Sequence, residues 1–227
     1  MRVFVLTGAG VSAESGLGTF RDADGIWARF DPMKLATPEA FATDPAMVHA
    51  FYNLRRRNVI DASPNEAHAA IAKLARHGDL FLCTQNIDDL HERAGSPSVH
   101  HMHGELLISR CAFCGARTEQ FGDLTTDDPC AACGRLGALR PDVVWFGETP
   151  FDLAAIEAAA VQADLFVSIG TSGGVYPAAG LVRLARHHGV RTAEINLEPS
   201  QIAGAFDKRR YGPASIEVAR FVAGLIG

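Results

Sequence analysis

The sequence predicts an α/β protein built on a parallel sheet with helices on both faces, plus a small inserted zinc-binding module. Short apolar runs alternate with helical patterns, and small or polar residues follow the end of each run, as in doubly wound sheets. Two CxxC pairs in the middle of the chain predict the module. We expect residues 1–104 and 140–227 to form the sheet domain, residues 105–139 to form the module, and the helical segment 25–60 to belong to the smaller lobe.

Composition and charge exclude several classes of protein. The 227 residues carry a net charge of −5, which argues against a protein whose main function is to bind nucleic acid, since that requires a basic surface. No apolar run approaches the ~18 residues of a membrane span. The amino terminus, MRVFVLTGAGVS, is too short in its apolar part for a signal peptide. Four of the five cysteines fall into CxxC pairs, which is typical of a metal site in a reducing compartment, so we expect a cytoplasmic protein.

The chain opens with a predicted strand, Val3–Thr7, followed by a glycine-rich loop from Gly8. A strand, a tight glycine turn and a helix start present backbone N–H groups to a phosphate, although the same string also fits a plain glycine turn. A dehydrogenase would have an acidic strand end ~20 residues further on. Residues 25–32 read GIWARFDP instead, which is no strand. The loop therefore predicts a nucleotide site outside the standard dehydrogenases.

Two helices are expected next. The first covers Asp44–Ile60 and places Tyr52 and Arg55, three residues apart, on one face. The second begins with a capping box at Ser63, with proline at the first helical position, and stops at Gly78.

A dense set of polar side chains, TQNID at Thr84–Asp88, follows the predicted strand Leu80–Cys83. Open α/β sheets bind ligands at the carboxyl ends of their strands. The same stretch later contains His103, and an amide, a carboxylate and an imidazole are the groups needed to move a proton on a hydroxyl or a water. Each residue alone also fits a polar turn with a surface histidine. Cys83 is expected to be an inert thiol of the core.

The two CxxC pairs have the spacing of a closed zinc site. Four thiolates leave no open coordination position, so the metal is expected to be structural. The polar segment 115–129 between the pairs has few large apolar residues and depends on the metal for its fold. The four predicted ligands are Cys111, Cys114, Cys130 and Cys133.

The alternation of strands and helices resumes after the module. The expected elements are a β-prone run at Arg140–Glu148, a helix at Leu153–Ala163, a strand at Leu165–Ile169, a helix at Pro177–His188, a strand at Thr192–Asn196 and a last helix at Pro213–Leu225.

Taken together, these motifs resemble the sirtuin family of NAD-dependent protein-lysine deacylases, of the bacterial type that prefers succinyl and malonyl groups. They occur in family order over nearly the whole chain. They are GAGVS at Gly8–Ser12, FR at Phe20-Arg21, TQNID at Thr84–Asp88, HG at His103-Gly104, the paired CxxC, VVWFGE at Val143–Glu148, GTS at Gly170–Ser172 and NLE at Asn196–Glu198.

The resemblance implies a Rossmann-like NAD-binding domain, formed by residues 1–104 and 140–227, that carries the zinc module at 105–139. NAD would be the co-substrate and one zinc would be structural. The catalytic residues would be His103 as general base, with Asn86 and Asp88. The cofactor-binding residues would be Gly8, Ala9, Gly10, Ser12, Ala13, Thr19, Phe20, Arg21, Trp27, Gln85, Asn86, Ile87, Asp88, Gly170, Thr171, Ser172, Asn196, Leu197, Glu198 and Ala214.

The resemblance also implies how a substrate binds. An acyl-lysine protein would add a strand, as an extended peptide, to Val143, Val144, Trp145 and Phe146. The Tyr-x-x-Arg pair, Tyr52 and Arg55, matches the subgroup that accepts succinyl and malonyl groups, since a phenol and a guanidinium can both bind a carboxylate. The products would be nicotinamide, deacylated lysine and O-acyl-ADP-ribose.

We expect a monomer that binds neither nucleic acid nor a membrane and that also retains deacetylase activity. Two other functions stay open: an NAD-dependent protein ADP-ribosyltransferase that uses the same pocket, and a zinc-ribbon protein that binds nucleic acid or a partner. A protein that does not bind NAD would favour the zinc-ribbon alternative.

Overall fold

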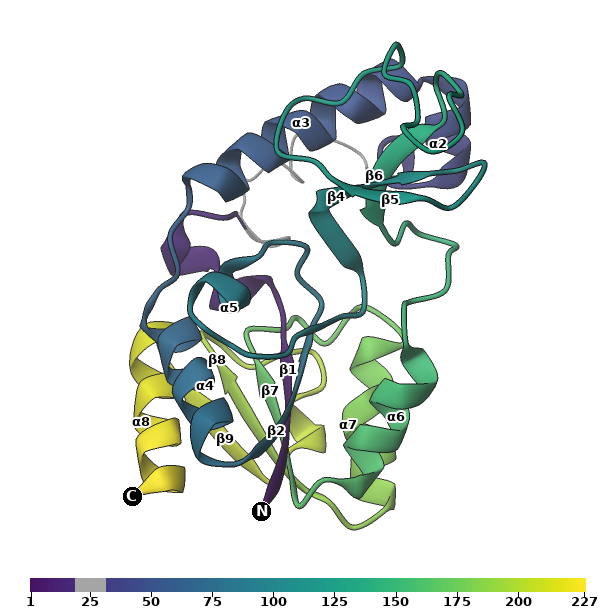
Figure 1. The fold of residues 1–227 in the computed structure, drawn as a ribbon. Coiled ribbons are helices and arrows are strands. Elements are labelled where there is room, and N and C mark those ends of the chain that lie inside the picture. Colours follow the sequence, from purple (N-terminus) through teal and green to yellow (C-terminus); the bar gives the residue numbers. More distant parts are fainter. Residues whose placement is uncertain (19–31) are drawn as a thin grey trace.

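The computed structural model describes residues 1–18 and 32–227. Its larger sheet has six strands, all parallel, in the order β3-β2-β1-β7-β8-β9 (Figure 1). Thr7, Thr84 and Ile169 share one level in the register, so the strands end at a common edge. The predicted parallel sheet is confirmed. Its strands are β1 (Arg2–Thr7), β2 (Asp79–Thr84), β3 (His100–His101), β7 (Leu165–Ile169), β8 (Arg191–Asn196) and β9 (Lys208–Tyr211).

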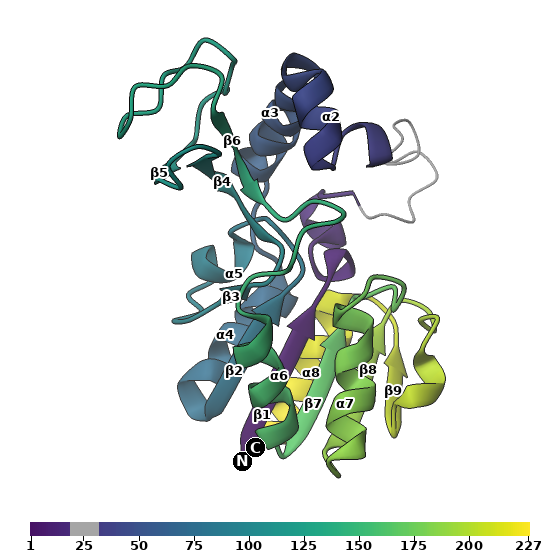
Figure 2. The same cartoon turned by 90° about the vertical axis from the view of Figure 1, so that its right-hand side faces the viewer.

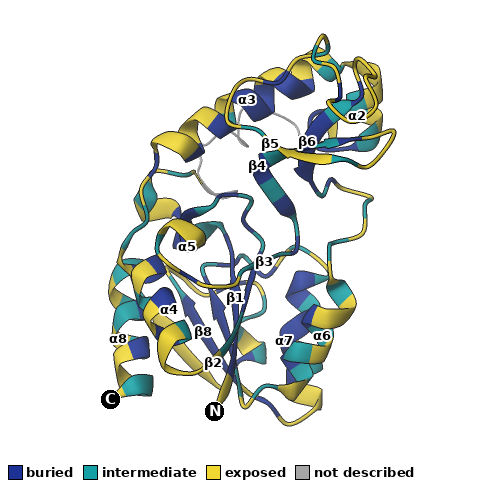
Figure 3. Cartoon of the chain, viewed as in Figure 1, coloured by how far each residue is buried: buried dark blue, intermediate teal, exposed yellow. Residues whose placement is uncertain are grey.

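Helices cover both faces of this sheet (Figure 2). Successive strand residues point to opposite faces, so Val3 and Val5 join the core under α4 and α8, while Phe4 and Leu6 join the core under α6 and α7. The outer sides of the helices stay exposed, whereas the inner strands β1, β7 and β8 are largely buried (Figure 3). Burial of both faces explains the almost continuous apolar run of β1. The helices are α4 (Glu66–His77), α6 (Leu153–Gln162), α7 (Leu181–His187) and α8 (Ala214–Ile226).

A second, antiparallel sheet in the order β5-β4-β6 lies beyond the carboxyl edge of the first (Figure 1). The long helix α3 packs against it, and Phe51 and Tyr52 of the helix share one core with Leu106 and Trp145. The elements are α2 (Pro38–Thr43), α3 (Pro45–Asp61), β4 (Gly104–Cys111), β5 (Arg117–Glu119) and β6 (Leu139–Val143).

The remaining elements are short. They are α5 (Leu90–Arg93) and 3₁₀ turns at Ala9–Val11, Ala13–Ser15, Pro32–Lys34, Ala178–Gly180 and Ala203–Ala205. Within residues 1–18 and 32–227, every helix is too short or too polar to cross a bilayer.

The structure corrects three predicted helix starts. The helix expected after Gly8 is a pair of 3₁₀ turns, the second of which ends at the left-handed Gly16. The capping box expected at Ser63 lies two residues later. The Asn65 side chain accepts the N–H of Ala67, and His68 Nδ1 accepts the N–H of Asn65 at 3.2 Å. An imidazole therefore plays the part that the sequence pattern assigns to a carboxylate.

The helix expected at Pro177–His188 is likewise a 3₁₀ turn followed by α7. The strands β3, β4, β5 and β9 were not predicted. β9, with the sequence KRRY, is an exposed edge strand without apolar alternation, so no hydrophobic pattern marks it.

Candidate active site and zinc site

A cavity of about 1180 Å³ lies at the carboxyl edge of the parallel sheet and is also lined by α3 and by the segment that follows β6. All predicted catalytic, cofactor-binding and substrate-binding residues in the described part of the chain line this cavity. Thr19, Phe20, Arg21 and Trp27 lie outside the described residues. The predicted residues on the cavity wall are Gly8, Ala9, Gly10, Ser12, Ala13, Tyr52, Arg55, Gln85, Asn86, Ile87, Asp88, His103, Val143, Val144, Trp145, Phe146, Gly170, Thr171, Ser172, Asn196, Leu197, Glu198 and Ala214.

The glycine loops after β1 and β7 touch each other through their backbones. The N–H of Gly10 donates to the carbonyl of Gly170 at 2.9 Å. A Cβ on Gly10 would lie 2.8 Å from the Gly170 Cα, and Gly170 itself has φ +62°. Both positions therefore require glycine, and the close approach leaves backbone, not side chains, at this part of the cavity wall.

Ser12 is the centre of a buried polar cluster. Its hydroxyl donates to Asp88 Oδ2 at 3.1 Å and accepts from the amide of Asn86 at 3.1 Å. Burial raises the pKa of Asp88, and the hydrogen bonds from Leu90 N–H and Ser12 partly offset this. The predicted pair Asn86 and Asp88 is thus brought together and oriented by one hydroxyl.

His68, which the sequence reasoning missed, completes this cluster. Because Nδ1 accepts the N–H of Asn65, the neutral ring carries its proton on Nε2, which lies 3.3 Å from Ser12 Oγ and donates to it. Burial lowers the pKa of His68 to about 4, so the ring is neutral at physiological pH. The sequence position of His68, near the start of a helix, does not indicate a contact with Ser12.

His103 is held as a neutral base. Its Nδ1 lies 3.0 Å from the Gln85 carbonyl. A carbonyl only accepts, so Nδ1 carries the proton and the lone pair of Nε2 stays available. Burial lowers the pKa of His103, although the bond to Gln85 acts in the opposite direction. The side chain lines the cavity, and the arrangement can remove a proton from a bound hydroxyl.

Tyr52 and Arg55 lie side by side on α3 at the cavity wall. The guanidinium carbon of Arg55 is 5.8 Å from the centre of the Tyr52 ring. Tyr52 is only 2% exposed, and its oxygen accepts the indole N–H of Trp145 at 3.0 Å. Burial raises the pKa of Tyr52 and lowers the pKa of Arg55. A guanidinium withdrawn from water gains more from an anionic ligand than an exposed one does.

The edge of the cavity near β7 and β8 is also built from polar backbone and small side chains. The amide of Asn196 donates to the carbonyl of Thr171 at 2.7 Å and ties the ends of the two strands together.

The sequence reasoning missed Asn58 and Tyr176, which line the cavity without belonging to any of the motifs.

The four cysteines of the CxxC pairs are positioned to bind a structural zinc. Their sulfurs all lie within 4.8 Å of one another. The Cys111–Cys133 and Cys114–Cys130 sulfurs are 3.8 and 3.7 Å apart. Tetrahedral zinc with Zn–S bonds of ~2.3 Å separates its ligand sulfurs by ~3.8 Å, so the donor set fits the ion. Cys83 is fully buried, and burial raises the pKa of its thiol to about 12, as expected for an inert core residue.

Comparisons with known proteins agree on one family. The model of the Sir2 family matches residues 8–177. An NAD-dependent protein deacylase of Caulobacter vibrioides is 58% identical over 231 residues, which cover 100% of this chain and 97% of the relative.

Solved structures are similar over the same length. A mutant Sir2 homologue in complex with ADP-ribose is 41% identical with a TM-score of 0.92, covering 98% of this chain and 90% of that one. A Sir2 homologue in complex with NAD is 41% identical with a TM-score of 0.89, covering 100% of this chain and 91% of that one.

Proposed function

This chain belongs to the Sir2 family and is an NAD-dependent protein deacylase, and we propose that it removes succinyl and malonyl groups from lysine side chains, with acetyl groups as further substrates. The observation that carries the proposed preference is the pair Tyr52 and Arg55 on the cavity wall. The phenol is buried and the Arg55 side chain is partly buried, and each can donate to the terminal carboxylate of an acidic acyl group.

NAD, when bound, supplies the ribose that receives the acyl group as nicotinamide leaves. We propose that the backbone of the loop from Gly8 to Gly18 holds the pyrophosphate, since phosphate oxygens suit clustered backbone N–H groups. At the other end of the cavity, Thr171, Ser172, Asn196 and Ala214 would hold the adenosine. The remaining cofactor-binding residues of the sequence prediction keep the same proposed role.

His103 would take the proton of a ribose hydroxyl through Nε2. The cluster of Ser12, Asn86 and Asp88 would orient the nicotinamide side of the cofactor, because its hydrogen bonds fix the amide and the carboxylate before any ligand arrives. In the overall reaction one water is consumed, and nicotinamide, free lysine and O-acyl-ADP-ribose are released.

The segment 143–146 would bind the substrate peptide as an added strand. The N–H groups of Val144 and Phe146 are taken by the carbonyls of His103 and Ala36. Among the described residues, no donor is bound to the carbonyl oxygens of Val144 and Phe146. Unpaired backbone acceptors support the proposed mode of binding, since an added peptide binds through its backbone N–H groups.

Matched succinyl-, malonyl- and acetyl-lysine peptides with NAD, followed by mass spectrometry, test the proposal. Arg55→Met should lower kcat/KM for succinyl and malonyl peptides about ten- to a hundredfold, as expected for a lost charge-assisted hydrogen bond. Arg57→Met is the matched control, because Arg57 lies on the same helix and pairs with Asp123 at the surface. An equal loss on all three peptides would refute the assignment of the acyl-binding pair.

The catalytic proposal has its own control. His103→Ala should abolish release of lysine from every peptide. Label from NAD that stays on the acceptor protein, without free O-acyl-ADP-ribose, would instead identify a transferase.

We also propose that the protein acts as a monomer in the cytoplasm on protein substrates and binds neither nucleic acid nor a membrane. The net charge of −5 supports the absence of nucleic-acid binding. Light scattering on a gel-filtration column measures the oligomeric state.

A further inference from the structure

A hydrogen bond between Trp145 and Tyr52 joins the segment after β6 to α3. The indole Nε1–H lies 3.0 Å from the phenol oxygen, and the two residues are 93 positions apart in the chain. An indole N–H only donates, so the phenol oxygen accepts in this bond. The proton of the Tyr52 hydroxyl must therefore point away from Trp145.

The cavity is the place to which this proton can point. Tyr52 is 2% exposed, and in the part of the chain that the structure describes no acceptor takes its hydroxyl proton. Tyr52, Arg55 and Trp145 all line the cavity. A buried donor without an acceptor is costly, so this part of the cavity favours a ligand that brings an acceptor oxygen.

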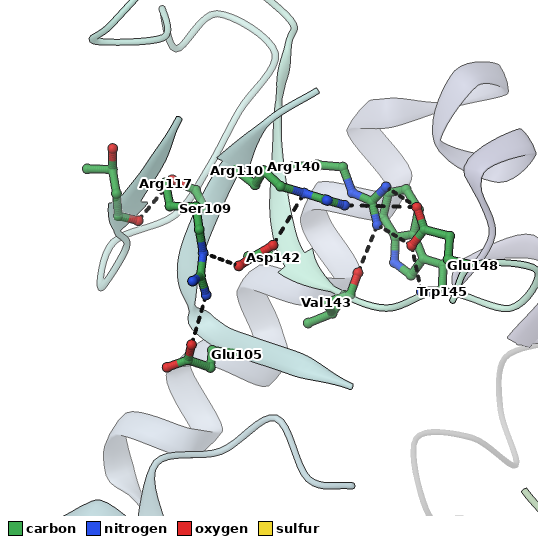
Figure 4. Close-up of polar contacts among 10 residues, drawn as sticks. Glu105, Ser109, Arg110, Arg117, Arg140, Asp142, Val143, Trp145 and Glu148 are labelled. Carbon is green, nitrogen blue, oxygen red and sulfur yellow. Dashed lines mark hydrogen bonds and ion pairs between the residues drawn. The ribbon is translucent and has the colours of Figure 1, made fainter. Parts of the chain in front are cut away.

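The indole itself is held in place by an ion pair (Figure 4). Arg140 donates two hydrogen bonds to Glu148, at 2.6 and 2.8 Å, and its guanidinium carbon lies 3.4 Å from the centre of the Trp145 ring system. The backbone N–H of Trp145 donates to the same carboxylate at 2.8 Å. Two anchors, one on the ring and one on the backbone, leave the indole N–H aimed at Tyr52.

We propose that Trp145 is a positioning residue for acyl selectivity: its N–H occupies the Tyr52 oxygen and directs the Tyr52 proton toward the terminal carboxylate of the acyl group. This inference rests on the proposed preference for acidic acyl groups and deepens it. Phenylalanine at this position would keep a ring against Arg140 but lose the N–H. The hydroxyl could then rotate, and its proton would no longer be committed to the ligand.

A double-mutant cycle tests the inference, with the ratio of kcat/KM for succinyl over acetyl peptides as the readout. Trp145→Phe should lower this ratio about three- to tenfold, which is the range expected for one neutral hydrogen bond. In the Tyr52→Phe background the same substitution should leave the ratio unchanged, because the hydroxyl through which it acts is gone. A fall by the same factor in both backgrounds, or no fall in either, would overturn the inference.

An NMR measurement reports the bond without any substrate. The chain has two tryptophans, so a ¹⁵N-labelled sample gives two indole N–H signals, and Trp145→Phe identifies one by its loss. Tyr52→Phe should move the Trp145 signal, and an unmoved signal would show that the bond is absent. If Trp145→Phe does not fold, 3-benzothienylalanine at position 145 keeps the bicyclic shape and lacks the N–H.

The same data separate this inference from the proposed function. A parent enzyme with no succinyl preference, unchanged by Tyr52→Phe, would overturn both. A preference that is lost in Tyr52→Phe but kept in Trp145→Phe would overturn only the role of Trp145.

Discussion

The ion pair of Arg140 and Glu148 is expected to stabilise the fold as well as the position of Trp145, and Glu148→Gln tests this. The carboxylate accepts three hydrogen bonds, two from Arg140 and one from the N–H of Trp145. A glutamine has a single carbonyl oxygen, so it loses one bond to Arg140 and the charge behind the other two.

The expected loss of unfolding free energy follows from burial. The Arg140 side chain is 7% exposed and the Glu148 side chain 24%. Removing one partner of a fully buried pair costs about 3–5 kcal/mol, and solvent around Glu148 reduces this to about 2–3 kcal/mol. Burial alone would raise the pKa of Glu148, but the hydrogen bonds and charge of Arg140 outweigh burial and lower it below 4.5.

A lowered carboxyl pKa gives stability that is present above the pKa of the unfolded chain and is lost as pH falls through the folded value. The difference between parent and Glu148→Gln should therefore be complete at pH 7 and should begin to shrink below about pH 4.5. Urea unfolding of the parent and of Glu148→Gln, at pH 7 and at a pH below about 4.5, gives the difference in unfolding free energy at each pH. Zinc content is measured in each sample. A loss below about 0.5 kcal/mol at pH 7 would be that of an exposed pair and would refute the reasoning, as would a loss that does not change with pH.

Three more predictions concern the metal, the base and a buried histidine. Cys130→Ser should release zinc and raise hydrogen exchange across residues 112–138, while α4 stays protected. The reason is that the local core contains only Cys111, Cys130 and Ala138 as buried residues in the described structure. Protection of residues 112–138 that survives zinc loss would contradict this prediction. The acid limb of kcat/KM should have its midpoint below pH 6.5, since burial lowers the pKa of His103 and only the neutral ring can take a proton, and a midpoint above 7 would contradict the neutral base. Burial alone would lower the pKa of His101, but Glu92 at 2.7 Å outweighs burial and raises it. Glu92→Gln should therefore cost up to about 1 kcal/mol of unfolding free energy at pH 6 and less at pH 9, because the stabilisation is lost when pH rises through the folded pKa. An equal cost at both pH values in urea unfolding would contradict that pairing.

Much of the cavity could be predicted from the sequence because parallel strands end at one edge. The predicted ends of β1, β2, β7 and β8 were correct to within a residue, and the polar residues that follow them necessarily meet there. The spacing of the CxxC pairs likewise predicted the four-sulfur cluster. The start of α4 was predicted two residues too early, because Ser63 and Asn65 are both competent N-cap residues. Only the packed structure shows that Asn65 caps the helix and that His68 completes the capping box.

Contacts between distant elements could not be predicted, and the proposed acyl-binding end of the cavity depends on one of them. Spacing along a helix places Tyr52 next to Arg55, but Trp145 reaches Tyr52 only through the pairing of β4 with β6, in which Gly104 lies opposite Val143. Gly104 has φ +82°, and a side chain there would collide with the Asp142 carbonyl, so the strands can approach at this point only without one. The next bond in the same pairing joins the N–H of Val144 to the carbonyl of His103. The register that places His103 at the cavity is therefore the register that brings Trp145 against Tyr52, and it ties the position of the proposed base to that of the proposed acyl-binding pair.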